Sequence, residues 1–580
     1  MHLMNPAIGD RSWIFPENRG YHRASDAHRR LVRGVPGVEM TLSLPNAGFA
    51  ARIFLEECIA PAQPLSEPGR ALAHSFRAFG PGEEAGLAGF WDRTEAFILL
   101  LRDHPTPLLE PHLKNCNGLW FLQEDSTSWG PVELARLESI AQSTRWLRNE
   151  IVTRLSAETC PSGGNSPLLE LLSPHCAGGG FLLAAEAGSG LALAREDLRM
   201  ATDRWQELDR ALREQVAGRL GTTAGRLRSD LTVSIDDEPK LRLCSEIEEL
   251  AEIAILPHQV QFRFTPTGEA REAHAGMTRL RQRCHQMETD AIFGLCTRLV
   301  PFLPRLNEEL DMVGRIDLLR GRARWAIQHA AVRPRLSDDG SMTAIEAHHP
   351  VIQTQVESLE RRYQSLTFTL RPSLVSLTGA NMGGKTAFLR TVGLLQALFQ
   401  LGYFIPASDF AARPVCSMAW VGAVPDSPTL GLSSFGRECR DLVDALHQDL
   451  PQLMLVDEFA RSTDAEEGLA LTGALLDHLC EAGEGLFVFA GHQKRLTCRV
   501  EGEIQYLHTG GLDFTAYLRN LGLMEAIPAL AASMNYQILN GCTISSDALQ
   551  IALALGVPEN LVRRAREILS GNASGMELSD

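Results

Sequence analysis

The stretch Leu374-Val-Ser-Leu-Thr-Gly-Ala-Asn-Met-Gly-Gly-Lys-Thr386 decides the fold of the C-terminal half of this 580-residue chain. Its first five residues, of which Leu374, Val375 and Leu377 are apolar, are expected to form a strand, and Ala387–Leu401 continues with a helical apolar pattern. A strand, a turn of the form G-x-x-x-x-G-K-[ST] and a helix, in that order, are the context that a phosphate-binding P-loop requires. The sequence therefore predicts an α/β domain with a nucleotide site.

The residue types of this loop are better explained by binding of nucleotide phosphates than by a glycine-rich turn that matches the motif by chance. Small glycines let backbone N–H groups close around phosphate oxygens at the positive end of a helix. Lys385 is expected to bridge the β and γ phosphates of ATP, and the Thr386 hydroxyl to ligate Mg²⁺. The predicted nucleotide-binding residues of the loop are Gly379, Asn381, Met382, Gly383, Gly384, Lys385 and Thr386.

Two further strands end in residues that could complete such a site. Leu453–Val456 runs into Asp457-Glu458, where we expect Asp457 to hold Mg²⁺ with Thr386 and Glu458 to activate the attacking water. Leu486–Ala490 runs into Gly491-His492, which places His492 where ligands of open α/β sheets bind. Acidic pairs and lone histidines are more often solvated surface groups. Beside a P-loop, Glu458 and His492 become candidate catalytic residues.

Four motifs together resemble those of the MutS family. They are Ala380-Asn-Met-Gly-Gly-Lys-Thr386, Ser433-Ser-Phe-Gly-Arg-Glu438, Val456-Asp-Glu-Phe-Ala-Arg-Ser-Thr463 and Gly491-His492, and their order and spacing match as well. The resemblance covers about residues 320–570 and implies an ATPase that uses ATP and Mg²⁺ at a site shared by two subunits. It also implies that Ser433 acts in trans on the nucleotide of a partner chain, in a homodimer or a MutS-like heterodimer. From the residues alone, Ser433-Ser434 would be a helix N-cap, and both roles can hold.

The chain departs from the family's pattern at a few positions. After Asp457-Glu458 the family usually reads Gly-Arg-Gly-Thr, where this chain has Ala460-Arg-Ser-Thr463. Thr386 replaces a serine and keeps the hydroxyl, so the expected Mg²⁺ role survives. His492 stands where the family generally has threonine.

The sequence before the P-loop predicts helices with one small β module. Pro131–Leu155 repeats apolar residues at three and four, and so do two long segments, Leu193–Leu220 and Ala273–Leu299. Between the long helices, Leu231–Ile235 and Val260–Phe264 alternate apolar and polar residues as half-buried strands do. This arrangement resembles the MutS lever helices and their inserted clamp.

We therefore predict a multidomain chain of four segments. An α-helical core and lever region with a small β insert is followed by an α/β P-loop (ABC-type) ATPase domain and a C-terminal helix-turn-helix. The segments are a helical region over residues 1–190, lever-like helices over 191–330 with the insert at 222–265, the ATPase domain over 331–525, and a helical dimerisation segment with a polar tail over 526–580.

Composition limits the setting and the partners. The net charge of −16 argues against a general nucleic-acid coating protein, although a local basic groove could still hold DNA. The chain shows no secretory signal pattern and no apolar run long enough to span a membrane, so we expect it in the cytoplasm. Twelve cysteines without a C-x-x-C pair suggest reduced, packed thiols.

Two functions remain open at this point. The N-terminal sequence does not resemble the mismatch-reading domain of MutS repair proteins, since Phe54-Leu-Glu56, the nearest match to its Phe-x-Glu, reads as part of an amphipathic helix over Ile53–Glu57. The first hypothesis is an ATPase coupled to DNA clamping in repair or recombination, without direct mismatch reading. The second is an ATP-dependent reactivating factor of a B12-dependent aminomutase, a role that some MutS-like ATPases without the mismatch domain serve.

Overall fold

The computed structural model describes most of the chain, and its contacts divide the chain into two compact units. The described residues are 47–103, 108–123, 129–155, 166–177, 180–183, 190–228, 230–379, 383–422, 434–461, 463–482, 484–491, 504–512, 534–541 and 548–574. Unit 1 contains residues 1–114, 150–160 and 311–580, and unit 2 contains 115–149 and 161–310. The four-segment division stays a prediction.

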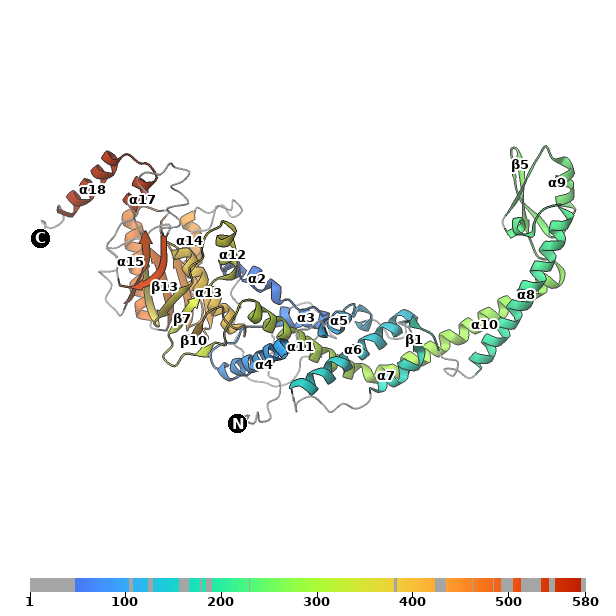
Figure 1. The fold of residues 1–580 in the computed structure, drawn as a ribbon, viewed down its shortest axis with the longest axis horizontal. Coiled ribbons are helices and arrows are strands. Elements are labelled where there is room, and N and C mark those ends of the chain that lie inside the picture. The colour runs from blue at the N-terminus through green and yellow to red at the C-terminus, as the bar shows by residue number, and fades with distance from the viewer. Residues whose placement is uncertain are drawn as a thin grey trace. The chain divides into compact units, whose positions relative to one another are not determined.

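Unit 1 is built on a six-stranded sheet with the order β11-β12-β13-β9-β14-β15. Figure 1 shows this sheet where β13 is labelled. Its strands are parallel except β15, which is antiparallel to β14. In chain order they are β9 (Ser373–Thr378), β11 (Ser417–Gly422), β12 (Gln452–Asp457), β13 (Gly485–Gly491), β14 (Ile504–Leu512) and β15 (Met534–Asn540). The predicted α/β architecture with strands at 374–378, 453–456 and 486–490 is confirmed.

Helices cover both faces of this sheet, which explains why β9, β11, β12 and β13 are buried almost throughout. The helices are α13 (Lys385–Gln400), α14 (Ser434–Leu446) and α15 (Ala465–Ala482). Val375 and Leu455 belong to the core that contains α13, whereas their neighbours Leu374 and Val456 belong to the core that contains α14 and α15. The alternation follows from the two-residue period of a strand.

A smaller sheet and several helices complete unit 1. The sheet order is β6-β10-β7-β8, with β6 (Arg335–Leu336), β7 (Met342–Ala347), β8 (Leu366–Leu370) and β10 (Asp409–Ala412). The helices are α1 (Ala47–Arg52), α2 (Leu55–Ile59), α3 (Glu67–Ser75), α4 (Glu84–Asp103), α5 (Leu109–Asn115), α12 (Pro350–Ser358), α17 (Ala548–Ala554) and α18 (Glu559–Ser574). Two longer helices, α6 (Pro131–Leu155) and α11 (Leu303–Gln328), run from one unit into the other.

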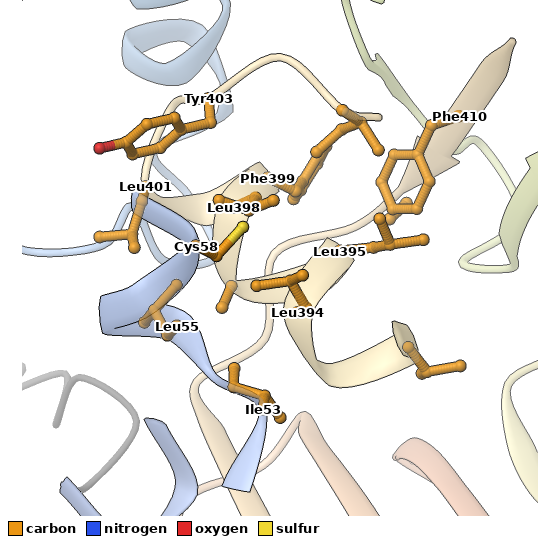
Figure 2. Packing of buried hydrophobic residues seen from close by; sticks show 14 of the residues in the cluster. Ile53, Leu55, Cys58, Leu394, Leu395, Leu398, Phe399, Leu401, Tyr403 and Phe410 are labelled. Carbon is orange, nitrogen blue, oxygen red and sulfur yellow. The ribbon is translucent and has the colours of Figure 1, made fainter. Parts of the chain in front are cut away.

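The first described residues, 47–59, contain α1 and α2 and are called the N-terminal segment below. This segment packs directly on α13, the helix that follows the glycine-rich loop. Figure 2 shows Ile53, Leu55 and Cys58 against Leu394 and Leu398 of α13. One helix boundary differs from the sequence prediction, because Ile53 and Phe54 are not part of an amphipathic helix that continues to Glu57. Phe54 has the left-handed backbone φ of 51° and separates α1 from α2.

Unit 2 contains two long helices that run side by side, α8 (Leu191–Arg219) and α10 (Gly268–Leu299) (Figure 1). Arg195 near the start of α8 pairs with Glu288 in the second half of α10, so the helices are antiparallel. The two predicted long helices are confirmed to within a few residues at their ends. Unit 2 also holds α7 (Pro167–Leu172) and the short pair β1 (Cys176–Ala177) and β2 (Gly180–Phe181).

The insert between these helices is a three-stranded sheet with one helix. The strands are β3 (Leu231–Ser234), β4 (Leu250–Leu256) and β5 (Gln259–Phe264), in the order β3-β5-β4, and α9 spans Glu238–Ser245. The two predicted strands are confirmed, but β4 was not predicted. The nine cysteines within the described residues are free thiols. No helix in the described part of the chain is long and apolar enough to cross a bilayer.

Candidate functional site

The register of the central sheet brings the predicted site residues to the carboxyl-terminal ends of its parallel strands, called the sheet edge below. Asp457 at the end of β12 lies opposite Gly422 on one side and Ala490 on the other. Thr378 at the end of β9 lies opposite Gly491 of β13. The loops that follow three neighbouring parallel strands therefore start at the same edge, as the order of the motifs predicts.

The described residues of the glycine-rich segment between β9 and α13 are in contact through Lys385. Gly379 and Gly384 have φ values of 152° and 82°, which only glycine adopts without strain. The N-cap of α13 is Gly384, which has no side chain to cap the first turn. The buried Lys385 ammonium donates to the Gly379 carbonyl at 3.0 Å and lies 3.5 Å from a Glu458 carboxylate oxygen. Burial lowers the pKa of Lys385, and the charge of Glu458 partly opposes this shift.

Thr386 and Asp457 form a pair of oxygen donors that fits a magnesium ion. The Thr386 hydroxyl donates to Asp457 Oδ2 at 2.9 Å. Adjacent ligands of an octahedral Mg²⁺ with bonds of about 2.1 Å lie about 3 Å apart, so the two oxygens already have the spacing of neighbouring ligands. Burial raises the pKa of Asp457, and the charge of Glu458 adds to this shift. A divalent cation would relieve both effects.

Glu458 is held in a strained backbone conformation. Its φ is 54°, and Ala460 two residues later has a φ of 59°. Such conformations cost about 1–3 kcal/mol each for residues other than glycine and persist only where the surroundings fix them. Here the Glu458 N–H donates to the Ala490 carbonyl at 3.0 Å. The carboxylate lies between two cations, Lys385 and Arg461, with the Arg461 contact at 2.7 Å.

Several residues next to the site were not predicted from the sequence. A Cβ added to Gly384 would lie 2.8 Å from the Tyr536 ring, and one added to Gly379 would lie 2.1 Å from the Thr509 hydroxyl. Thr509 of β14 and Tyr536 of β15 therefore lie directly against Gly379 and Gly384. Arg390, one turn beyond Thr386 on α13, interacts electrostatically with Asp457. Its i+4 spacing from Thr386 was the only sequence signal for this group.

Four of the predicted site residues lie outside the described part of the chain. They are Asn381, Met382, Ser433 and His492. The described neighbours of Ser433 and His492 are the first turn of α14 and the end of β13. Gly379, Gly383, Gly384, Lys385, Thr386, Asp457 and Glu458 come together at the sheet edge.

The fold and the site define an α/β protein whose parallel sheet carries a glycine-rich loop and an Asp-Glu pair on neighbouring strands. Residues 375–571 match the family model described as MutS domain V. Over 295 residues the chain is 28% identical to the DNA mismatch repair protein MutS of Syntrophomonas wolfei, covering 50% of this chain and 33% of that protein. Over 308 residues it is 31% identical to the endonuclease MutS2 of Thermomicrobium roseum, covering 51% and 37%. Residues 375–571 of this chain are therefore a MutS-family domain. The chain spans about a third of the length of these curated relatives.

Proposed function

We propose that the protein is a MutS-type ATPase that binds and hydrolyses Mg-ATP at the edge formed by β9, β12 and β13. The observation that carries this proposal is the convergence of Lys385, Glu458 and the Thr386–Asp457 pair at a glycine-rich loop. One cation, two oxygen donors for a metal and one further carboxylate are the groups that phosphoryl transfer to water requires.

Each of these residues has a separate role in the proposed reaction. Lys385 leaves its contact with the Gly379 carbonyl and binds the β and γ phosphate oxygens. Thr386 and Asp457 would hold Mg²⁺, and the bound ion would neutralise charge that develops on the phosphates. Glu458 accepts a proton from the attacking water, since its carboxylate is next to Lys385 and therefore next to the γ-phosphate position. We expect His492 to hydrogen-bond the γ-phosphate or that water.

Glu458→Gln tests the proposed roles, because glutamine keeps the shape of the side chain and cannot act as a base. We expect ATP binding to stay close to the wild-type value and steady-state hydrolysis to fall by about 10²- to 10⁴-fold. The matched control is Glu467→Gln on the exposed first turn of α15, which should hydrolyse ATP normally. Normal turnover in Glu458→Gln would remove this residue from the proposed mechanism.

We further propose that the active form is a dimer with the nucleotide between two subunits. The MutS resemblance assigns Ser433 to the partner's γ-phosphate, and Ser433 directly precedes α14. A helix N-terminus is a favourable place for an anion. The dimer is either a homodimer or a pairing with a second MutS-like chain.

For the client of the ATPase, we propose DNA in repair or recombination as the first candidate. The relatives named above are a DNA mismatch repair protein and an endonuclease, which supports a nucleic-acid client. The clamp-like insert would then contact phosphates through Arg226, Arg228 and Lys240. The proposed role is clamping rather than direct mismatch reading, since the sequence around Phe54-Leu-Glu56 does not resemble the mismatch-reading domain.

The second candidate is a protein client, such as a B12-dependent aminomutase that the ATPase reactivates. The charge of the insert favours this candidate, since residues 222–265 contain eight carboxylates and five Lys or Arg side chains, a net charge of −3 with histidine neutral. One of the five cations, Arg263, is already paired with Asp230 at 2.8 Å. β4 also exposes Ile255 by 71% and Ile253 by 40%. An acidic surface with exposed apolar side chains suits a protein better than a phosphate backbone.

A gel shift with duplex and branched DNA at several salt concentrations distinguishes the two clients. If DNA is the client, binding should be present at about 50 mM salt and fall steeply by about 200 mM. An Arg226→Gln/Arg228→Gln variant should weaken it further if the insert makes the contact. Failure to shift either DNA at low salt would exclude the DNA candidate and leave the protein client.

A further inference from the structure

The N-terminal segment of unit 1 contacts the ATP site region through polar groups as well as through the apolar core. Arg52, the last residue of α1, reaches across the end of the central sheet. Its guanidinium donates to the Gly422 carbonyl at 3.3 Å and to Asp441 Oδ2 at 3.1 Å. It also lies 5.7 Å from the centre of the Trp420 ring. A single side chain thus joins α1, the end of β11 and α14.

One of the two groups that Arg52 holds, Gly422, lies next to the proposed Mg²⁺ ligand Asp457. Gly422 lies opposite Asp457 in the sheet, and a Cβ at Gly422 would be 2.3 Å from the Asp457 carbonyl oxygen. Burial lowers the pKa of Arg52, and Asp441 and Asp457 both oppose this shift. The Arg52 charge is therefore within electrostatic range of the proposed Mg²⁺ ligand.

Helix α14 links Asp441 to the loop Glu458–Ala460. Glu438 lies three residues before Asp441, about one helical turn away, and is only 2% exposed. Its carboxylate accepts the Ala460 N–H at 2.9 Å, which is one of the contacts that hold the strained loop after Glu458. Any shift of α14 along or around its axis moves this acceptor relative to the loop.

A second contact line runs in parallel from the same N-terminal segment to α13. The Arg390 guanidinium stacks 4.8 Å from the centre of the Phe54 ring. Phe54 in turn packs edge-on against the buried His349, whose Nε2 lies 3.1 Å from the Ile53 carbonyl. Residues 52–54 therefore contact both α13 and α14, the two helices that begin at the site.

We propose that Arg52 is a positioning residue for ATP hydrolysis. Through Asp441 it fixes the position of α14 relative to the N-terminal segment, and Glu438 of α14 in turn fixes the position of the Glu458–Ala460 loop. This inference rests on the proposed ATPase function and adds its regulation. Movement of the N-terminal segment would change turnover without a direct contact to the nucleotide. Arg52 acts on the rate of the chemical step because the residues it holds position Asp457 and Glu458.

The test is a kinetic comparison of Arg52→Ala, Asp441→Asn and the double variant, with Arg77→Ala as the control. Arg77 pairs with Glu83 and is 22% exposed, against 20% for Arg52 paired with Asp441. We expect both single variants to keep the ATP dissociation constant within about twofold and to lose roughly 10- to 100-fold in kcat. The double variant should lose no more than the larger single loss, since both changes break one link. Arg77→Ala should hydrolyse ATP at the wild-type rate.

Amide hydrogen exchange of the peptide 457–461, measured without nucleotide, gives a readout that does not depend on hydrolysis. Arg52→Ala should raise exchange at Ala460 about tenfold or more, because the Glu438 acceptor is no longer held in place, and Arg77→Ala should not. Unchanged exchange in Arg52→Ala, or losses of kcat that Arg77→Ala shares, would overturn the proposal. If the exchange responds but the wild-type protein does not hydrolyse ATP, the link stands and the proposed ATPase function falls.

Discussion

At the scale of single residues, the site is defined by groups whose ordinary preferences are overridden. Lys385 is buried although lysine is rarely so, and Ala460 has a left-handed backbone where the family usually has glycine. Both deviations are held by neighbours, Lys385 by Gly379 and Glu458, and Ala460 by Glu438. Deviations of this kind concentrate at functional sites, where selection for function outweighs their cost in stability.

Thr386 gives a direct test of the metal role. Thr386→Val removes the hydroxyl and keeps the volume, so we expect Mg²⁺-dependent hydrolysis to fall by about 10- to 100-fold or more and the Mg²⁺ concentration for half-maximal rate to rise. Thr386→Ser keeps the donor and should retain most of the activity. Equal Mg²⁺ dependence in the valine variant and the wild type would show that Thr386 does not ligate the metal.

His349 predicts a pH dependence of stability. Burial lowers the pKa of this fully buried imidazole to about 4, and the hydrogen bond to Ile53 only partly opposes the shift. Between about pH 6.5 and 4 the unfolded chain takes up a proton at His349 that the folded chain refuses, so stability falls as pH falls. The loss approaches about 3 kcal/mol at the acid end.

Denaturant unfolding of wild type and His349→Gln at pH 7 and pH 5 measures this effect. The variant should be less stable at pH 7, because it loses the packing against Phe54, but its stability should change less between the two pH values. His258→Gln, at an exposed position of the insert, is the control. An identical pH dependence in wild type and His349→Gln would contradict the argument.

At the scale of elements, α13 is confined between the N-terminal segment and the sheet. A Cβ at Gly393 would lie 2.8 Å from Ile53 Cγ2, 3.0 Å from Leu455 Cδ1 and 3.1 Å from Phe49 Cζ. Alanine in place of a helical glycine normally stabilises by up to about 1 kcal/mol. For Gly393→Ala we instead expect the free energy of unfolding to fall by about 1–2 kcal/mol, because overpacking outweighs that gain.

Gly276→Ala in α10 is the matched control, because nothing lies within 4 Å of a Cβ at that position. It should raise the midpoint of thermal unfolding slightly or leave it unchanged. A stabilising effect of Gly393→Ala would mean that the N-terminal segment is not packed on α13 as described.

The elements that the sequence predicted are those with strong local patterns. The strands ending at Thr378, Asp457 and Gly491 are rich in apolar residues and lie next to motifs, and the long helices repeat apolar residues over many turns. β4 was missed because Glu252 and a register shift before Ala254 interrupt its alternation. The turn at Phe54 was missed because its left-handed backbone follows from packing against His349 and Arg390, which are distant in sequence.

The same reason limits what the sequence says about the site. Lys385, Thr386, Asp457 and Glu458 were recognisable because each follows a strand within a short motif. Arg52 gave no signal, since its partner Asp441 is 389 residues away in the sequence. Pairings over such separations depend on the folded arrangement of several elements.

At the scale of the whole molecule, the proposed dimer predicts complementation between inactive chains. Lys385→Ala lacks a working P-loop, and Ser433→Ala lacks the group proposed to act in trans. A mixed dimer of the two has one site with both an intact P-loop and an intact serine. Mixing equal amounts should restore about a quarter of the wild-type turnover, since half of the dimers are mixed and each has one intact site. Absence of turnover in mixed dimers verified by differential tagging would contradict sharing between independently acting sites.

In the proposed function, the loop at Gly379–Thr386 binds ATP through Lys385. The most direct measurement is an ATP binding isotherm of the full-length wild-type chain and of Lys385→Ala in the presence of Mg²⁺, with folding of both checked by thermal unfolding. We predict that the wild type binds ATP and that Lys385→Ala, while still folded, binds it at least about 10- to 100-fold more weakly, because a charge-assisted contact to phosphate is lost. Equal ATP affinity in the two proteins, or no ATP binding by the wild type, would contradict the account.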